Sequence, residues 1–395
     1  MKTVPHLGRQ LLLFTCFTLL LFPAPLRAGG SRHEEQAPEI FSSIWNVPEL
    51  HADKDNSAIQ SLSLVGRYHG QYWSVDSGDA SADDWENRRF YLGFNTRLFQ
   101  QFTLEVQISI NDDFSPVYKG LYDAFLKWEN SAGDFAVSGG RLDYVYTGME
   151  RSTSSKKIKT MERALLVNQI MPGEVIGLYA TGERGDFSYQ TGLFSGSIKD
   201  EFTDFDGGFA ALLGFGYRLP LFYDTGILHL DYLYNNGNVD NNAFKPYKHI
   251  VSLWHQGQRG RLGLDVDFTM AGGVDESSDL FGLTLLPTYE LGSNMLLRGD
   301  RLQLALRYHY ASSSDEHGLD LNKRYEQKVA SGKGDSYKGY YLGLNYSLYQ
   351  QKLKLMTGLE YFEMEGVTDA NDTGSMAGSD TIDGWSFISG VRLYF

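Results

Sequence analysis

The chain has 395 residues and a formal net charge of −14, with 35 basic against 49 acidic side chains, one cysteine, 24 Phe, 25 Tyr and 6 Trp. This acidity excludes a nucleic-acid binder, because such proteins need a basic surface to neutralise phosphates. After residue 22 no apolar run approaches the roughly 20 residues that a membrane helix requires, which excludes a polytopic helical membrane protein. A hydrophobic content of 42% excludes a disordered chain, and a single cysteine excludes disulfide frameworks and cysteine-rich zinc sites.

Residues 1–28 have the three parts of a secretory signal peptide. Lys2 and Arg9 precede an apolar core at residues 11–22, and residues 23–28 add helix breakers and a small residue. We expect cleavage near Ala28, which removes three basic residues and makes the net charge −17. The only cysteine lies inside the apolar core, so the exported chain is expected to be free of thiols.

A short polar segment, residues 29–58, comes next, and residues 59–395 form one predicted domain of alternating apolar and polar side chains. A period of two is the pattern of a β-strand whose two faces differ. In residues 102–111, apolar and polar side chains interleave without an error, and residues 89–98 alternate in the same way. The short link at 99–101 predicts a β-hairpin between them, and the fold class is all-β.

The alternation fits either a soluble sandwich or a transmembrane antiparallel β-barrel. Three features favour the barrel: ionised residues such as Glu105 and Asp265 on the polar faces, tyrosines near the ends of the apolar faces, and short turns that alternate with long polar connections. We expect short turns near 99, 130–134, 259–260 and 350–351, and long loops at 76–86, 195–208 and 312–338.

The length of the predicted domain sets the number of strands. Sixteen strands allow about 21 residues for each strand with its connection, which suits an outer-membrane barrel, although 14 or 18 strands also fit. Such a barrel leaves an aqueous lumen unless something fills it. The last strand alternates from Trp385 and ends on Phe395, which resembles the insertion signal of barrels in the outer membrane of a Gram-negative-type bacterium.

Six stretches follow one another along the predicted barrel: GRYHGQYW (66–73), NRRFYLGF (87–94), SSKKIKTMERALLVNQ (154–169), GDFSYQTGLFSG (185–196), YLGLNYSLY (341–349) and KLKLMTGLEY (352–361). In order and spacing they resemble the phosphate-selective porin O and P family, over about residues 41–395. The resemblance implies a 16-stranded, usually trimeric porin. It also implies a constriction loop folded into the lumen, with basic side chains that guide anions.

Residues 150–163 interrupt the strand pattern and are rich in cations. The candidate residues that constrict the pore and guide anions are Arg151, Lys156, Lys157, Lys159 and Arg163. If the segment folds inward, these cations raise the local concentration of anions in a narrow passage of low dielectric constant. Alternatively, the segment is a surface loop whose lysines contact solvent or the phosphates of lipopolysaccharide.

Several arginines fall on polar strand faces and are candidates to line the lumen: Arg67, Arg89, Arg97, Arg141, Arg307 and Arg392. Each can instead pair with an acid across neighbouring strands, such as Glu105, Asp123, Asp265, Asp267 or Glu360. Because the predicted interior mixes both signs of charge, a general or weakly anion-selective pore fits as well as strict phosphate specificity.

Two other functions stay open. One is a structural or adhesive barrel with a closed lumen and long loops that bind a partner. The other is an outer-membrane hydrolase, but His69, His229 and His309 accompany no nucleophile motif and no zinc spacing. The acidic stretch 200–206 lacks the glycine placement of a known calcium loop.

We therefore predict an outer-membrane porin and not an enzyme, with no catalytic residues, no metal and no cofactor. It forms a passive, water-filled channel for small hydrophilic solutes and prefers anions such as phosphate. The expected partners are the lipid bilayer, lipopolysaccharide, small anionic solutes and further copies of the chain in a homotrimer.

Overall fold

The computed structural model describes residues 38–78, 80–143, 147–170, 173–198, 200–202, 205–237, 240–244, 247–273, 279–313, 318–321, 324–330, 332–367 and 381–395. The predicted signal peptide and residues 29–37 lie outside this range, so the structure does not test their assignment. Among the described residues, no helix has the length and apolar character needed to cross a bilayer.

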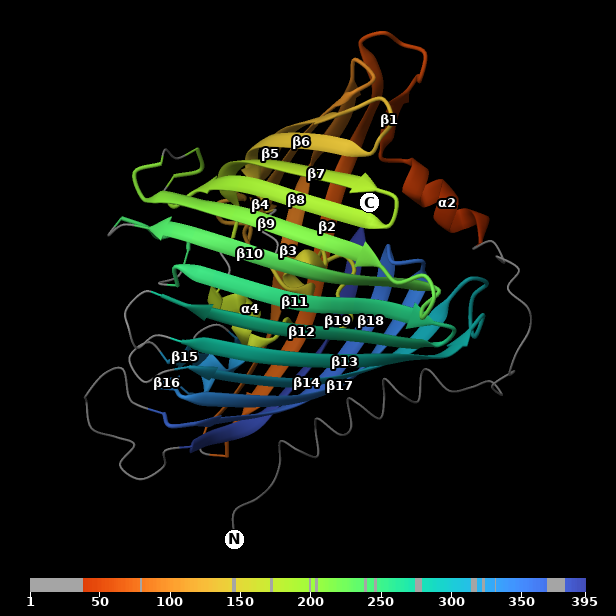
Figure 1. Cartoon of the computed structure of the whole chain (residues 1–395). Helices are drawn as coiled ribbons and strands as arrows, with labels where there is room; N and C mark the ends of the chain where they lie inside the picture. Colours follow the sequence, from red (N-terminus) through yellow and green to blue (C-terminus); the bar gives the residue numbers. More distant parts are fainter. Residues whose placement is uncertain are drawn as a thin grey trace.

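Long antiparallel strands form one sheet that closes on itself (Figure 1). The closing pair is β19 with β2, in register from Tyr394 opposite Arg67 to Trp385 opposite Asp76. In the described part of the chain, sixteen strands make the ring, which confirms the predicted all-β barrel. They are β2 (Ile59–Asp76), β3 (Ser81–Leu98), β4 (Phe102–Ile110), β5 (Tyr118–Glu129), β6 (Phe135–Leu142), β7 (Val175–Arg184), β8 (Phe187–Ser195), β9 (Gly208–Arg218), β10 (Thr225–Gly237), β11 (His249–Arg259), β12 (Leu262–Gly272), β13 (Leu280–Ser293), β14 (Arg301–Ser313), β17 (Ser336–Tyr349), β18 (Leu353–Glu365) and β19 (Thr381–Tyr394).

Smaller elements lie outside or inside this ring. The helix α2 (Glu39–Asn46) and the strand β1 (Glu49–Ala52) precede the barrel. Between β6 and β7 lie the short helices α3 (Met149–Ser152) and α4 (Leu165–Ile170). Between β14 and β17 lie β15 (Leu319–Asp320), the 3-10 helix η2 (Tyr325–Lys328) and β16 (Lys333–Gly334).

The connections differ between the two ends of the barrel. At one end the strands meet in tight turns, such as the β3–β4 turn, where Phe99 and Gln100 have φ angles of 49° and 66°. Positive φ at both central residues matches the twist of a hairpin, and the predicted hairpin is confirmed. The longer connections, including the predicted loops at 195–208 and 312–338, lie at the other end, on the left of Figure 1. We call these the turn end and the loop end.

The prediction of a long loop at residues 76–86 is wrong. β2 and β3 keep pairing from Tyr72 opposite Trp85 to Asp76 opposite Ser81, and the amide of Ser77 donates to the carbonyl of Ala80 at 3.0 Å. This hairpin lies at the loop end, where Trp73 and Val75 are buried and Ala82 packs against buried residues. Its hydrogen bonds come from the backbone, which a polar composition does not prevent.

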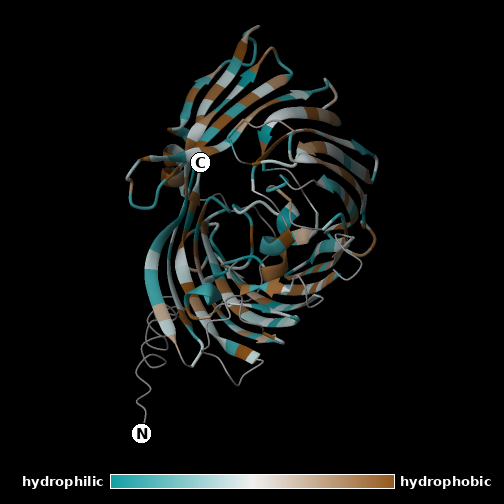
Figure 2. Cartoon of the chain, turned by 90° about the vertical axis from the view of Figure 1, so that its left-hand side faces the viewer, coloured by the Kyte–Doolittle hydropathy of each residue, from teal (hydrophilic) through white to brown (hydrophobic). Residues whose placement is uncertain are grey.

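The inward faces are also less polar than alternation predicts. Near the loop end, several inward side chains are apolar and at most 2% exposed: Phe194, Leu212, Leu233, Ile250 and Leu280. They belong to one hydrophobic cluster with Leu165 and Ile170 of α4. Viewed from the loop end, Figure 2 shows short helical segments inside the ring of strands. Part of the lumen is thus filled by a packed core, and only the rest can hold water.

Candidate functional site

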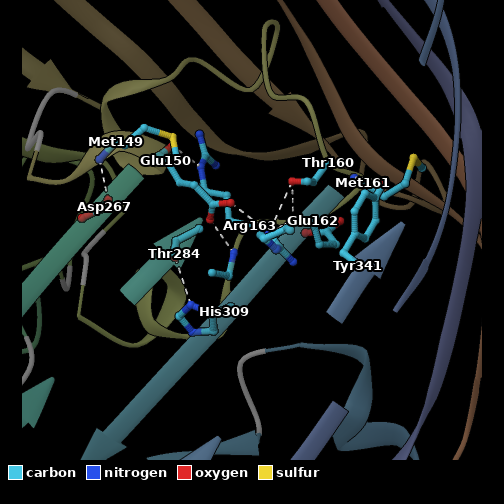
Figure 3. Close-up of polar contacts among 12 residues, drawn as sticks. Met149, Glu150, Thr160, Met161, Glu162, Arg163, Asp267, Thr284, His309 and Tyr341 are labelled. Atoms are coloured by element: carbon cyan, nitrogen blue, oxygen red, sulfur yellow. Dashed lines mark hydrogen bonds and ion pairs between the residues drawn. The ribbon is translucent and has the colours of Figure 1, made fainter. Parts of the chain in front are cut away.

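Residues 147–170, which we call the lumenal segment, contact strands on several sides of the barrel interior. α3 is anchored first: the amide of Gly148 donates to Asp231 of β10 at 3.2 Å, and that of Met149 donates to Asp267 of β12 at 2.6 Å (Figure 3). Free amides at the start of a helix suit carboxylates. Gly148 has a φ of 83°, and a Cβ there would meet Asp267 Oδ2 at 2.6 Å, so this approach requires glycine.

A buried network of charges then ties the segment to the wall. Arg307 of β14 donates to Glu150 of α3 at 2.9 Å and to both oxygens of Glu360 of β18 at 3.1 Å. Arg324, which precedes η2, also donates to Glu360, at 3.1 Å for one of its two bonds. All four side chains are at most 5% exposed. Glu360 therefore joins the lumenal segment, the wall and the β14–β17 connection.

The tip of the segment contacts the opposite wall. The hydroxyl of Ser155 accepts a hydrogen bond from Arg67 of β2 at 2.6 Å, and the carbonyl of Met161 accepts one from Arg392 of β19 at 2.8 Å. The carboxylate of Glu162 accepts hydrogen bonds from Arg88 of β3 at 3.0 and 3.3 Å. The segment thus reaches from β10 and β12 across to β19, β2 and β3.

The five cations predicted to guide anions have different surroundings. Arg151 pairs with Asp143, and Lys159 donates to both oxygens of Asp265 at 2.9 and 2.7 Å. Arg163 donates to the carbonyls of Glu150 and Thr153 at 2.9 and 2.8 Å. The Lys156 ammonium lies 5.1 Å from the centre of the Tyr394 ring, and Lys157 is exposed.

The arginines predicted to line the lumen separate into two groups. Arg67 lies over the rings of Tyr91 and Tyr122 at 5.2 and 5.4 Å, and Arg307 belongs to the buried network. Arg97 and Arg141 bond to nearby groups instead: Arg97 to the Gln100 carbonyl at 2.8 Å in the β3–β4 turn, and Arg141 to the Leu121 carbonyl at 2.8 Å. Of the predicted acid partners, Glu360 pairs with an arginine, while Asp265 and Asp267 bind the lumenal segment.

A row of basic side chains crosses four neighbouring strands where the tip of the segment meets the wall. The register places Lys354 of β18 opposite Arg392, Arg392 opposite His69 of β2, and His69 opposite Arg89 of β3. Both ring nitrogens of His69, Nε and Nη1 of Arg392, and Nη1 of Arg89 are buried without a hydrogen-bond partner in the described structure. Lys354, Arg392 and Arg89 form no salt bridge with any described residue. We call these four residues the basic row.

Sequence reasoning missed two members of this site. Lys354 falls on the polar face of its strand, and this position was the only feature of the sequence that indicated a place in the interior. Arg88 should point outward by alternation, since its neighbour Arg89 points inward. A register shift between His69 and Gly70 leaves Arg88 as an extra residue in β3, and this bulge lets two successive arginines act on the interior.

The surroundings shift the pKa values of groups on the lumenal segment. Burial alone would raise the pKa of Glu162, but Arg88 and Arg89 hold it well below its usual value, so this carboxylate stays ionised. Burial, with help from Arg89 and Arg151, lowers the pKa of Arg163 to about 10. Burial and the nearby charge of Arg67 lower the pKa of Lys156.

The three histidines considered for a hydrolase are bound within the wall. His309 Nδ1 lies 3.0 Å from the Thr284 hydroxyl (Figure 3), and His229 stacks on Trp254 at 4.8 Å between ring centres. His69 belongs to the basic row. The described residues hold no group of three or more His, Cys, Asp or Glu placed to bind a metal ion.

Over nearly its full length, the chain is similar in structure to OprB of Pseudomonas putida, with 13% identity, a TM-score of 0.58, and 93% of this chain and 100% of the other covered. It is similar to an anion-selective porin from Comamonas acidovorans, with 12% identity, a TM-score of 0.57 and coverage of 85% and 99%. It is also similar to the outer-membrane channel DcaP of Acinetobacter baumannii, with 11% identity, a TM-score of 0.53 and coverage of 88% and 100%.

At such low identity these likenesses establish the fold alone. No curated protein sequence matches the chain. The model of the phosphate-selective porin O and P family matches residues 63–241, which include the lumenal segment and β2 and β3 with their part of the basic row. Over residues 63–241 the chain is therefore similar to the phosphate-selective porin O and P family, and its fold is the closed barrel of a porin.

Proposed function

We propose that this outer-membrane barrel is a passive, water-filled channel for small hydrophilic solutes, with a preference for anions such as phosphate. The observation that carries the proposal is the basic row. Lys354, Arg392 and Arg89 form no salt bridge within the described structure, and Glu162 is the acid nearest to them on the segment. Like charges on adjacent strands repel, and an anion in the passage relieves that repulsion. A passage of low dielectric constant strengthens the attraction.

The lumenal segment would supply the constriction. Three of the cations have partners within the protein: Arg151 pairs with Asp143, Lys159 with Asp265, and Arg163 donates to backbone carbonyls. These partners partly neutralise or bind the charges, which leaves them less able to attract an anion. Lys156 and Lys157 make no such bond to a carboxylate of the described chain, and they are the two cations of the segment best suited to attract a passing anion.

The test is a reversal potential measured in planar bilayers under a salt gradient. The wild-type channel is expected to prefer anions, and the K156E/K157E double variant should shift the reversal potential toward cations. An R97E variant is the matched control, because Arg97 lies near the end of β3, where it donates to the Gln100 carbonyl of the β3–β4 turn and pairs with Glu129. Cation preference in the wild type would refute anion selectivity, and an unchanged potential in the double variant would place both lysines outside the pathway.

A second candidate function is favoured by the packed core in the lumen. Leu165 and Ile170 of α4 join the apolar inward residues of β8 to β11 in one cluster, which narrows the space left for water. A barrel closed in this way would serve a structural or adhesive role through its loops. We also propose, from the signal-peptide pattern, that residues 1–28 are removed on export and, from the family resemblance, that three copies assemble in a lipopolysaccharide-containing membrane.

A further inference from the structure

The helix α2 lies against the outer surface of the barrel at the turn end. Phe41 stacks on Tyr349 with 5.1 Å between ring centres, and Trp45 lies 5.0 Å from the same ring. The indole nitrogen of Trp45 donates to the carbonyl of Tyr394 at 2.7 Å. In Figures 1 and 2, α2 lies beside the ring of strands near the C-terminal end of the chain.

The register shows that this contact surface faces outward. A shift between Ser347 and Tyr349 places Tyr349 opposite Leu353, and Leu353 is opposite Leu393. Leu393 follows the inward-facing Arg392 and therefore points to the outside. The same shift that ends the pairing of β17 with β18 thus turns Tyr349 outward and gives α2 its docking site.

The sequence of α2 divides the helix into three flanks. At 100° per residue, Phe41 and Trp45 form the flank that contacts Tyr349. Glu39, Ser42 and Asn46 form a polar flank. Ile40 and Ile44, with Val47 directly after the helix, form a third flank between these two.

This third flank is apolar and has no partner among the described residues. Ile40, Ile44 and Val47 are 65%, 52% and 76% exposed, and Leu50 in the following strand is 56% exposed. The flank carries no charge, and its helix packs on Tyr349, which lies opposite the outward-facing Leu353. Short turns of outer-membrane barrels lie on the periplasmic side, so the helix is level with the inner boundary of the membrane.

We propose that α2 is an interfacial membrane helix, whose Ile40, Ile44 and Val47 flank inserts into the acyl-chain boundary of the periplasmic leaflet. At the edge of a bilayer, one flank of the helix can contact the barrel, the apolar flank can contact acyl chains and the polar flank can contact water. Trp45, with an apolar ring and a bonded indole nitrogen, is typical of that depth. The inference goes beyond conduction and requires only that the barrel spans the membrane.

Single-cysteine variants test the depth of the helix. Each variant also carries C16S, so that the introduced cysteine is the only thiol, and is labelled with a fluorophore and reconstituted into lipid vesicles. I44C reports the apolar flank, and S42C, on the polar flank of the same helix, is the matched control. L230C, in the outward face of β10 and 47% exposed, reports the barrel itself. Quenching is measured with nitroxide lipids labelled near the headgroup or deep in the chain, and with aqueous iodide.

The I44C label should lose fluorescence with the shallow nitroxide lipid and be protected from iodide, while the S42C label shows the reverse. Iodide quenching at I44C without lipid quenching would overturn the inference, because the flank then faces water. Protection of I44C from both quenchers would also overturn it, in favour of a second copy of the chain on this flank. Loss of lipid quenching at L230C as well would refute the membrane barrel, and the inference with it.

Discussion

Glu360 is the residue on which the interior depends most directly. Its two oxygens accept bonds from Arg307 and Arg324, both fully or almost fully buried. Arg307 in turn binds Glu150, and Arg324 lies 3.6 Å from Glu326. A buried ion pair contributes little beyond what an apolar pair would, but removal of one partner leaves the other charge buried and uncompensated.

We therefore predict that E360Q lowers the free energy of unfolding by about 3–5 kcal/mol, the usual cost of breaking a buried pair. Urea unfolding in lipid vesicles, followed by tryptophan fluorescence, measures the change. The matched control is E363Q on the same strand, because Glu363 bonds the partly exposed Lys338 at 2.8 Å. Equal effects of the two variants would show that the network does not hold the interior together.

At the scale of the element, the lumenal segment is fixed by many anchors rather than by one. Its start binds Asp231 and Asp267, its middle binds Arg307 through Glu150, and its tip is held from the opposite wall. Lys156 stands on the tip, where burial and Arg67 lower its pKa. A lowered pKa means that the ammonium loses its proton at a lower pH than a free lysine does.

The anion preference should consequently fall as the pH rises. The fall should occur at a lower pH than the one at which an ordinary lysine loses its proton. Deprotonation removes a positive charge from the passage, so the reversal potential moves toward cations. Measurements of this potential over an alkaline pH series should show the step in the wild type and in K157M, but not in K156M. A step that survives in K156M would have to arise from another group.

At the scale of the whole molecule, the barrel encloses both a passage and a packed core. The apolar cluster near the loop end and the lumenal segment both occupy space inside the barrel and so limit the volume that remains for water. The continuous backbone pairing of the sixteen strands does not depend on either.

Replacement of residues 153–162 by a short Gly-Ser link should therefore raise single-channel conductance and the rate of liposome swelling with small sugars. The matched control replaces the Ser77–Ala80 turn, which lies at the tip of the β2–β3 hairpin. If only the shortened variant conducts, the segment closes the native lumen and the structural or adhesive function is correct. If neither wild type nor variant conducts, the channel function is refuted.

Particular residues show how far the sequence alone could lead. The unbroken alternation at 102–111 and the short link before it predicted the β3–β4 hairpin. A strand with one polar and one apolar face shows a period of two residues in its sequence. The same rule failed at Arg88, where a bulge adds one residue, and at 76–86, where polar residues continue a strand beyond the membrane. Neither event changes composition, so neither leaves a sequence signal of its own.

By itself the sequence determined the all-β barrel and its family resemblance, since these follow from local period and short motifs, whereas chain length favoured sixteen strands and the closed sheet settled that number. Only the tertiary structure decided which charges meet: the basic row joins residues 69, 89, 354 and 392 through pairings between strands far apart in the chain. It also decided that Leu212 and Leu233 face inward and join one hydrophobic cluster with Leu165 and Ile170 of α4. The physical reason is that alternation assigns two faces to a strand, whereas closure of the sheet and the path of the lumenal segment determine what each face meets.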